Sequence, residues 1–422
     1  MKKGFIIAAT SSGSGKTTLA LGLMKYFSDR GFSVMPYKCG PDYIDTIYHQ
    51  IATGRLSINL DMFMASENHV KSLFDHYAGT HEINIVEGAM GMFDGYDGMH
   101  GSAADLAIKL DLPVVLLINS SSTAYSVGAT IYGFTHFNKD VKIAGVIFNK
   151  VASDSHYAFL KKACEDVGIP SLGYLKKNEK LQVPSRHLGL SLESQESIKR
   201  FIDEAAGEVS KNVDIEKLVR ITDLKERSSF FDFQKKKNLK VAVAFDEAFN
   251  FIYPVNIESF NCEIIKFSPL RDSVLPEVDL VYLPGGYPEL YSDTLEKNIM
   301  MRKAIKDFAE KGGKILAECG GMIYLTEEID GIRMCGVLPL KTTMNDAHLN
   351  LGYRRVRFPN LEIRGHEFHY SKIFPHREIP SYAKQFNVVN KEVETPVYRY
   401  KNVIASYTHL YWGETDIFKL WE

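Results

Sequence analysis

The sequence predicts an α/β protein built from two doubly wound domains, and three observations support this. Short apolar runs alternate with amphipathic stretches, as expected for parallel strands that are covered by helices on both faces. The alternation is interrupted by a charged stretch, 203–240, and then starts again. The chain has 422 residues, of which 45% are apolar and 24% charged, which is enough material for two ordinary globular cores.

Five apolar runs in the first half are expected to form strands, and the stretch 17–27 is expected to form a helix. These strands are expected at 6–9, 34–37, 83–86, 113–118 and 142–148. The second half is expected to contain strands at 241–244, 279–283 and 314–317, with one helix over 295–311. We place the boundary near residue 236, which gives domains 1–235 and 236–422, and we interpret the lysines 235–237 as a solvated linker.

The composition excludes several classes of protein. Lys and Arg total 50 and Asp and Glu total 52, a formal net charge of −2, so no nucleic-acid partner is expected. No apolar run reaches the roughly 18–20 residues of a membrane span, and the stretch 5–9 is too short for a secretory signal, so we expect a cytoplasmic protein with no membrane partner. The five cysteines include no Cys-x-x-Cys pair, which argues against a disulfide framework and a structural zinc site.

The first predicted site is a phosphate-binding loop at residues 10–18, directly after the first expected strand. Its sequence nearly matches the P-loop pattern, with Thr10 where that pattern has its first glycine. The two glycines allow backbone N–H groups to curl around phosphate oxygens, and the following helix directs its positive end at the anion. We expect Lys16 to reach the β- and γ-phosphates of ATP and the Thr17 hydroxyl to bind Mg²⁺. The predicted nucleotide-binding residues of the loop are Gly13, Ser14, Gly15, Lys16, Thr17 and Thr18.

Carboxylates follow two of the expected strands and are candidate ligands for a metal or a substrate. Asp42 and Asp45 come just after the second strand. Glu87 follows the third strand, and Asp94 lies a short loop further on. The carboxyl ends of parallel strands converge on the ligand crevice of such a sheet. These acids therefore suit Mg²⁺, which takes few protein oxygen ligands together with substrate phosphates. The alternative is that each is a helix cap or a turn residue.

The second predicted site is a nucleophile elbow at Cys319, where a strand ends and two glycines precede a helix. Such a turn exposes the sulfur, and we expect the helix N-terminus to lower the pKa of the thiol. A second glycine-rich turn, 284–289, also follows a strand and can supply N–H groups that stabilise an oxyanion. A thiol nucleophile needs a base, and His409 is the candidate. The alternative for Cys319 is a buried small apolar residue.

These motifs, in this order, closely resemble one family over essentially the whole chain: the cobyrinate a,c-diamide synthases of corrinoid biosynthesis. The resemblance rests on segments 10–18, 38–45, 87–95, 145–150, 186–190, 246–251 and 365–371, on the Cys319 turn and on the His409 segment. It implies an N-terminal P-loop synthetase domain similar to dethiobiotin synthetase. It also implies a C-terminal, flavodoxin-like glutaminase domain similar to class I glutamine amidotransferases.

The resemblance implies roles for the residues of both sites. Cys319 would attack the amide of L-glutamine with His409 as base and acid. The N–H groups of Gly286 and Gly320 would form the oxyanion hole. Released ammonia would cross an internal passage to the first domain, where ATP and Mg²⁺ would phosphorylate a tetrapyrrole carboxylate that ammonia then attacks. The roles implied there are metal binding by Thr17, Asp45 and Glu87, handling of the metal or the reacting carboxylate by Asp42 and Asp94, and adenine recognition by Asn149.

The expected activity is ATP- and glutamine-dependent amidation of the a and c acetate carboxylates of cobyrinate. The same motifs would serve nickel sirohydrochlorin or hydrogenobyrinate, and a P-loop ATPase switch with a non-catalytic second domain is the alternative of another class. Class I glutaminases usually carry Glu two residues after the histidine, where this chain has Tyr411. This departure suggests a Cys–His dyad and leaves open what orients His409. A homodimer is the default expectation.

Overall fold

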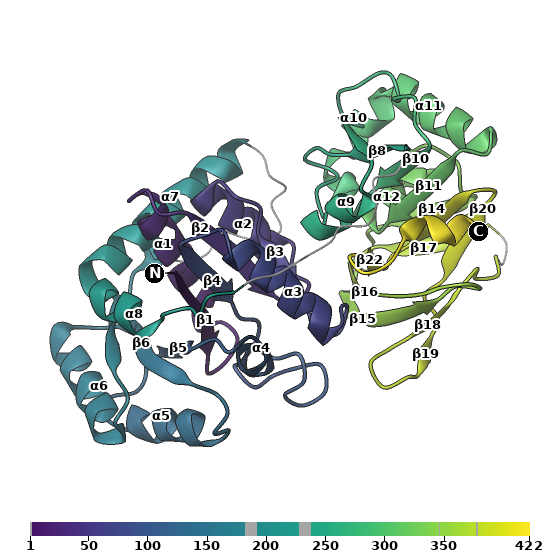
Figure 1. The fold of residues 1–422 in the computed structure, drawn as a ribbon. Coiled ribbons are helices and arrows are strands. Elements are labelled where there is room, and N and C mark those ends of the chain that lie inside the picture. Colours follow the sequence, from purple (N-terminus) through teal and green to yellow (C-terminus); the bar gives the residue numbers. More distant parts are fainter. Residues whose placement is uncertain (1, 182–191, 228–237, 346, 377–378) are drawn as a thin grey trace. The chain divides into compact units, whose positions relative to one another are not determined.

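The computed structural model describes residues 2–181, 192–227, 238–345, 347–376 and 379–422. The boundary placed near residue 236, the lysines 235–237 and the segment 186–190 lie outside these ranges. The chain forms two compact units, an N-terminal unit with the described residues up to 227 and a C-terminal unit with those from 238 onward. Each unit contains a parallel sheet covered by helices (Figure 1).

The N-terminal unit is built on a seven-stranded sheet with the order β3-β2-β4-β1-β5-β6-β7, in which all neighbouring strands are parallel. Its strands are β1 (Lys3–Ala9), β2 (Val34–Cys39), β3 (Ile58–Leu60), β4 (Ile83–Glu87), β5 (Val114–Asn119), β6 (Ile143–Val151) and β7 (Ser171–Lys176). The five strands predicted for this half are confirmed, while β3 and β7 were not predicted. Strands β1, β2 and β4 are almost wholly buried, which explains their continuous apolar sequences.

Helices cover this sheet on both faces (Figure 1). They are α1 (Lys16–Ser28), α2 (Ile44–Thr53), α3 (Glu67–Ala78), α4 (Ala103–Leu110), α5 (Val127–His136), α6 (Asp154–Val167), α7 (Leu192–Asn212) and α8 (Ile215–Ile221), with a short 3₁₀ turn at Glu179–Leu181. Helices α1, α2 and α7 pack together, whereas α3 packs on α4 and α5 on α6. Right-handed crossovers place α1 and α2 on one face and α3 to α6 on the other, so the unit is doubly wound.

The C-terminal unit has a six-stranded main sheet with the order β9-β8-β10-β11-β21-β20. Its strands are β8 (Lys240–Ala244), β9 (Glu263–Phe267), β10 (Leu280–Leu283), β11 (Lys314–Glu318), β20 (Val397–Tyr400) and β21 (Val403–Ser406). The first five in this order are parallel, and β20 joins antiparallel at the edge. The parallel strands follow the flavodoxin-like 2-1-3-4-5 arrangement, which confirms the predicted fold class.

The helices of this unit differ from the prediction at one place. They are α9 (Pro254–Phe260), α10 (Ser292–Lys297), α11 (Ile299–Glu310) and α12 (Gly320–Leu325), with 3₁₀ turns at Pro288–Tyr291 and Ile417–Trp421. The single helix predicted over 295–311 is wrong, because Asn298 has a non-helical ψ of 67° and separates α10 from α11. Its side chain accepts a hydrogen bond from the Met301 N–H and donates to two backbone carbonyls outside the helices. Asn298 therefore ends one helix and caps the next.

A β-rich region between β11 and the C-terminus was not predicted. It forms a four-stranded sheet of β12 (Glu328–Ile329), β13 (Ile332–Arg333), β14 (Leu340–Thr343) and β17 (Lys372–Pro375). A five-stranded sheet contains β15 (Asn350–Arg357), β16 (Glu362–His369), β18 (Lys384–Phe386), β19 (Glu392–Val393) and β22 (His409–Tyr411). Strand β22 carries His409 and pairs with β16, so this sheet delivers the predicted base. In the described part of the chain, no helix has the length and apolar character to cross a membrane.

Candidate active sites

The phosphate loop links the end of β1 to α1, as its sequence predicts. Gly13 and Gly15 have φ of +73° and +100°, values that L side chains rarely adopt. A Cβ on Gly15 would lie 2.1 Å from the Asn149 Nδ2 atom, so this glycine also allows a close approach. Thr10 does not have a positive φ, so its position does not require the glycine of the usual pattern. The buried Lys16 ammonium donates to the carbonyl oxygen of Met90, and burial, followed by the charge of Lys38, lowers its pKa.

A buried charged cluster lies at the carboxyl ends of β2 and β4. Glu87 is its centre: its Oε1 accepts hydrogen bonds from Thr17 Oγ1 at 2.7 Å and from Lys38 Nζ at 3.0 Å. Its Oε2 lies 2.7 Å from His49 Nε2, and Lys38 Nζ is 2.6 Å from Asp45 Oδ2. Burial opposes the ionisation of Glu87, but Lys38 and His49 outweigh it and hold the pKa of Glu87 well below its ordinary value.

The structure thus brings together the three predicted metal ligands, Thr17, Asp45 and Glu87, and their oxygen donors are of the type that Mg²⁺ prefers. It adds Lys38, whose ammonium bonds both carboxylates, and His49. Sequence reasoning missed these two residues. Lys38 lies directly opposite Glu87 on the neighbouring parallel strand, a pairing that neither segment of the sequence shows by itself. Among the residues that the structure describes, no group of three or more His, Cys, Asp or Glu side chains is arranged to hold a metal ion.

Three other predicted residues make local contacts around this cluster. Asp42 Oδ1 accepts hydrogen bonds from the N–H groups of Ile44 and Asp45 at the start of α2. Asp94, on the surface, accepts from the Gly91 N–H at 2.9 Å. Asn149 donates through Nδ2 to the Ser14 carbonyl at 2.7 Å and accepts from the Lys150 N–H. Both polar ends of Asn149 therefore hold backbone, and its role in adenine recognition stays a prediction.

In the C-terminal unit, Cys319 connects β11 to α12 with φ +47° and ψ −108°, a strained conformation for a residue with a side chain. The turn is tight: a Cβ on Gly321 would lie 2.0 Å from the Leu283 carbonyl oxygen. Cys319 is only 4% exposed, and its Sγ lies 3.7 Å from the Phe368 carbonyl oxygen. The strand–turn–helix geometry predicted from the sequence is present, but the prediction that this turn exposes the sulfur is wrong, because Cys319 is buried.

The prediction of a lowered thiol pKa is wrong for this structure. Burial raises the pKa of Cys319 far above its ordinary value, and the carboxyl group of Glu289 adds to this shift. The Gly320 N–H acts in the predicted, opposite direction but is outweighed. The thiol is therefore neutral in the resting protein and needs a base to become a nucleophile.

His409 lies in β22 with its ring fully buried. The ring stacks on that of His366, with 5.1 Å between centroids and 21° between planes. On another side it touches Gly285, where a Cβ would lie 2.2 Å from the His409 Cε1 atom. Burial and the neighbouring His366 and His369 hold the pKa of His409 well below its ordinary value. The imidazole is therefore neutral at pH 7, the state in which one ring nitrogen can accept a proton.

The glycine turn after β10 links the two predicted catalytic residues. Gly285 touches His409, and the next residue, Gly286, lies against the Cys319 elbow. A Cβ on Gly320 would lie 3.0 Å from the Gly286 backbone nitrogen, so the two predicted oxyanion-hole residues are adjacent. Gly286 has φ +153° and a Cβ there would lie 2.1 Å from the Ala248 carbonyl oxygen, so only glycine fits.

Tyr411, which stands where class I glutaminases usually have glutamate, packs into a defined aromatic cluster. Its ring packs edge-on against Tyr253, whose hydroxyl lies 3.0 Å from the His366 Nδ1 atom. His366 in turn stacks on His409. Sequence reasoning did not identify His366 as a neighbour of His409, or Tyr253 as a neighbour of His366, because these residues come from segments far apart in the chain.

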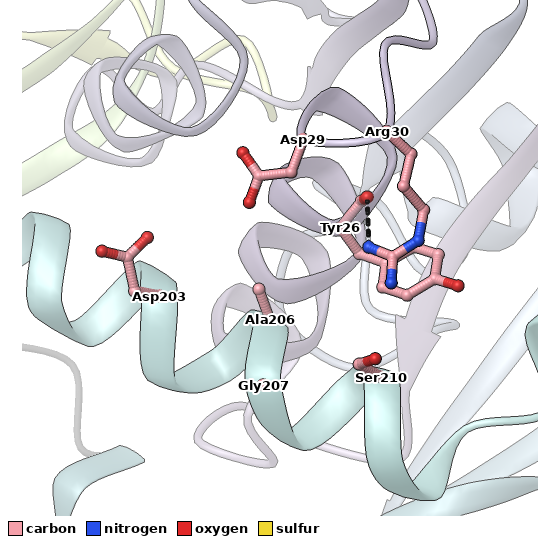
Figure 2. A pocket seen from close by; sticks show the side chains of 7 residues that line it. All are labelled: Tyr26, Asp29, Arg30, Asp203, Ala206, Gly207 and Ser210. Carbon is pink, nitrogen blue, oxygen red and sulfur yellow. Dashed lines mark hydrogen bonds between the residues drawn. The ribbon is translucent and has the colours of Figure 1, made fainter.

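A surface pocket in the N-terminal unit is separate from these residues. It lies between α1 and α7, where Arg30 covers the Tyr26 ring (Figure 2). It is lined by Tyr26, Asp29, Arg30, Asp203, Ala206, Gly207 and Ser210. None of these is a predicted site residue, and the mixture of charges suggests no particular ligand.

Comparisons with known proteins agree with this picture. Residues 5–190 match the CobQ/CobB/MinD/ParA nucleotide binding domain, and residues 240–417 match the CobB/CobQ-like glutamine amidotransferase domain. The cobyrinate a,c-diamide synthase of Caldanaerobacter subterraneus subsp. tengcongensis is 40% identical over 96% of this chain and 94% of that protein. Proteins of the same name from Methanobrevibacter smithii and Picrophilus torridus are each 37% identical, with the same two coverages. Each site described above lies within one of the two matched domains.

Proposed function

Because this chain belongs to the cobyrinate a,c-diamide synthase family, we propose that it uses ATP and glutamine to amidate the a and c acetate carboxylates of cobyrinate. The observation that carries the proposal is the presence of both machineries in one chain: a phosphate loop beside buried carboxylates, and a cysteine elbow beside a buried histidine. A P-loop switch with an inert second domain would have no use for the second set.

In the glutaminase reaction, His409 takes the Cys319 proton as the sulfur attacks the amide carbon of glutamine. The N–H groups of Gly286 and Gly320 stabilise the oxyanion. The C–N bond breaks, His409 returns the proton to the leaving nitrogen, and ammonia departs from a thioester. Water then hydrolyses the thioester to glutamate and restores the thiol. Cys319 starts as a neutral thiol and His409 as a neutral imidazole, and burial makes the proton transfer between them uphill, because it raises the pKa of the donor and lowers that of the acceptor.

In the synthetase reaction, a carboxylate oxygen of the tetrapyrrole attacks the γ-phosphorus of ATP and ADP leaves, which gives an acyl phosphate. Ammonia attacks the acyl carbon and phosphate leaves, which gives the amide. Lys16 and the backbone of the loop hold the phosphates. Asp42 and Asp94 lie on the two loops beside the charged cluster and are assigned to the metal or the reacting carboxylate.

Thr17, Asp45 and Glu87 are the residues that would hold Mg²⁺. Bound there, the ion would neutralise charge on the transferred phosphoryl group. Lys38 bonds both carboxylates, so the ion would share them with the Lys38 ammonium.

The proposal also includes the domain bounds, the cellular location and the oligomeric state. The domains are assigned as 1–235 and 236–422. The protein is assigned to the cytoplasm, where ATP is available and where its five cysteines, which form no disulfide, are stable as thiols. A homodimer is proposed because three exposed aromatic side chains, Tyr132 in α5, Phe137 directly after α5 and Phe159 in α6, would be covered by a second copy. Sedimentation of the wild-type protein and of Phe137→Glu tests this, and two identical monomer profiles would contradict it.

The function is tested by mass-spectrometric amidation assays with ATP, Mg²⁺ and either glutamine or ammonium salt. Cobyrinate is expected to gain two amides with either nitrogen source. Cys319→Ala is expected to lose glutamine-dependent amidation and keep ammonia-dependent amidation, whereas full glutamine use by this variant would contradict the assigned nucleophile. Hydrogenobyrinate and nickel sirohydrochlorin are tested in parallel. If either is amidated faster than cobyrinate, that compound would be assigned as the substrate instead. Hydrolysis of ATP without any tetrapyrrole, together with no binding of glutamine, would favour the switch.

A further inference from the structure

Glu318, the last residue of β11, is a buried carboxyl group that the proposed reaction does not use. It immediately precedes Cys319 and is 1% exposed. Both of its oxygens are engaged: Oε2 accepts a hydrogen bond from the Tyr282 hydroxyl at 2.7 Å, and Oε1 accepts from the Leu410 N–H at 3.0 Å. Leu410 immediately follows His409. One side chain therefore links the residue before the nucleophile to the residue after the base.

The contact with Leu410 joins two different sheets of the C-terminal unit. Glu318 belongs to the main sheet, where β11 pairs with β10 and β21. Leu410 belongs to β22, at the edge of the five-stranded sheet. Without the glutamate, the buried Leu410 N–H would lose this acceptor.

The edge of β22 that faces away from β16 is completed by side chains instead of a further strand. The Leu410 N–H donates to Glu318, and the Leu410 carbonyl accepts from Asn256 Nδ2 at 2.8 Å. The next residue but one, Trp412, donates its N–H to Asn256 Oδ1. Asn256 comes from α9, so of these two side chains only Glu318 ties β22 to β11, the strand that leads into Cys319.

We propose that Glu318 is a positioning residue that fixes the backbone of His409 relative to Cys319. This inference rests on the proposed function, in which these two residues are base and nucleophile. In class I glutaminases a glutamate two residues after the histidine usually orients the ring, and this chain has Tyr411 at that position. Glu318 would instead orient His409 through the backbone of the next residue, Leu410. The stacking of His409 on His366 and against Gly285 then sets the plane of the ring.

Glu318 acts in this role through hydrogen bonds and not through negative charge. Burial raises the pKa of its carboxyl group to about 8, so the group is mostly protonated at pH 7. A glutamine side chain has nearly the same shape, and its amide oxygen can accept from the Leu410 N–H. Leucine has a similar volume but offers no acceptor.

The test compares Glu318→Leu with Glu318→Gln in glutamine-dependent and ammonia-dependent amidation. For Glu318→Leu we expect the glutamine-dependent kcat to fall about 100-fold with little change in the KM for glutamine, because a small displacement of a catalytic group costs about that much. Ammonia-dependent amidation is expected to stay within about threefold of wild type, which shows that the chain is folded. Glu318→Gln is expected to restore glutamine use to within about fivefold of wild type.

Three results would overturn the inference: unchanged glutamine use in Glu318→Leu, equal losses in the Leu and Gln variants, or a change in KM alone. If Glu318→Leu does not fold, Tyr282→Phe replaces it, since this variant keeps the Leu410 contact but lets the carboxyl group turn. It is expected to lower the glutamine-dependent kcat about tenfold, and no change would count against the inference. Failure of the proposed function is distinguishable, because either the wild-type chain would then show no glutamine-dependent amidation or Cys319→Ala would keep it.

Discussion

The N-terminal site keeps Lys38 and Glu87 charged in its interior, whereas the C-terminal site holds its buried catalytic pair, Cys319 and His409, neutral. Lys38 retains a raised pKa and Glu87 a lowered one, because each lies beside opposite charge that outweighs the cost of burial. For Cys319 and His409 burial is the largest cause and is not outweighed, so it raises the pKa of the thiol and lowers that of the imidazole. A site for phosphates and a cation needs charges in place before the ligand arrives. A site that moves one proton between sulfur and nitrogen can begin neutral.

The largest expected effect separates the two chemistries. Lys16→Ala removes the cation of the phosphate loop, and amidation with either nitrogen source is expected to fall about 1,000-fold. Glutamine hydrolysis, measured as glutamate release, is expected to persist. If Lys16→Ala lost glutamine hydrolysis to the same extent as amidation, the two sites would not work independently.

Removing a charge from the N-terminal cluster tests its paired character. Glu87→Gln leaves Lys38 with one carboxylate instead of two, and we expect a loss of about 3 kcal/mol in the free energy of unfolding of this unit. Denaturant unfolding measures this loss in the free energy of unfolding, and calorimetry provides a second measurement. The control is Glu82→Gln, an exposed carboxylate of the same unit, which is expected to cost about 1 kcal/mol or less. Equal losses in the two variants would contradict the special role of the buried cluster.

The C-terminal site depends on close approach more than on charge. In Gly285→Ala the new methyl group would overlap the His409 ring, so we expect the glutamine-dependent kcat to fall about 100-fold while ammonia-dependent amidation is kept. Gly133→Ala is the matched control, because a Cβ there meets nothing within 4 Å. A fully active Gly285→Ala would show that the ring does not need this position.

The smallest expected effect is a difference in pH dependence. Glu318 has a folded-state pKa of about 8, above its unfolded value, so its stabilising contribution is complete in acid and is lost as the pH rises through about 8. Glu87 has a lowered pKa, so its contribution is present above the unfolded value of about 4.3 and is lost as the pH falls further. Alkali is therefore expected to weaken the C-terminal unit and acid the N-terminal one.

Calorimetry from pH 9 down to well below pH 4 measures this difference, since the Glu87 contribution is lost only below its unfolded pKa of about 4.3. Glu318→Gln is expected to raise the Tm of the C-terminal unit at pH 9 by a few degrees relative to wild type, and to lower it slightly or not at all at pH 5. If the Tm fell by the same amount between pH 5 and pH 9 in the wild type and in Glu318→Gln, the pH dependence would arise from another group.

The parts of the fold that the sequence predicted are those with continuous apolar strands and glycine turns. Strand β1 with its phosphate loop and strand β11 with its elbow combine a buried apolar run with a backbone that only glycine or a strained residue can adopt. The strands of the five-stranded sheet escaped prediction because they are polar and partly exposed, as in β15. The break at Asn298 depends on backbone partners that the local sequence does not show.

Within the sites, prediction succeeded for residues in motifs and failed for their long-range partners. Lys38 and Glu87 are 49 positions apart, and Glu318 and Leu410 are 92 apart. The thiol pKa of Cys319 was predicted in the wrong direction, because the local helix could be read from the sequence but the depth of burial could not.

The exposure of the cysteines has a practical consequence. Cys262 is the one half-buried thiol of the five, and the other four, Cys319 included, are buried. A small general alkylating reagent should therefore react first at Cys262, at the edge of the C-terminal unit's main sheet. An electrophile shaped like glutamine would instead be drawn to Cys319. One chain thus offers two orthogonal attachment points, a surface one for a fluorophore and an internal one that reports on occupancy of the glutamine site.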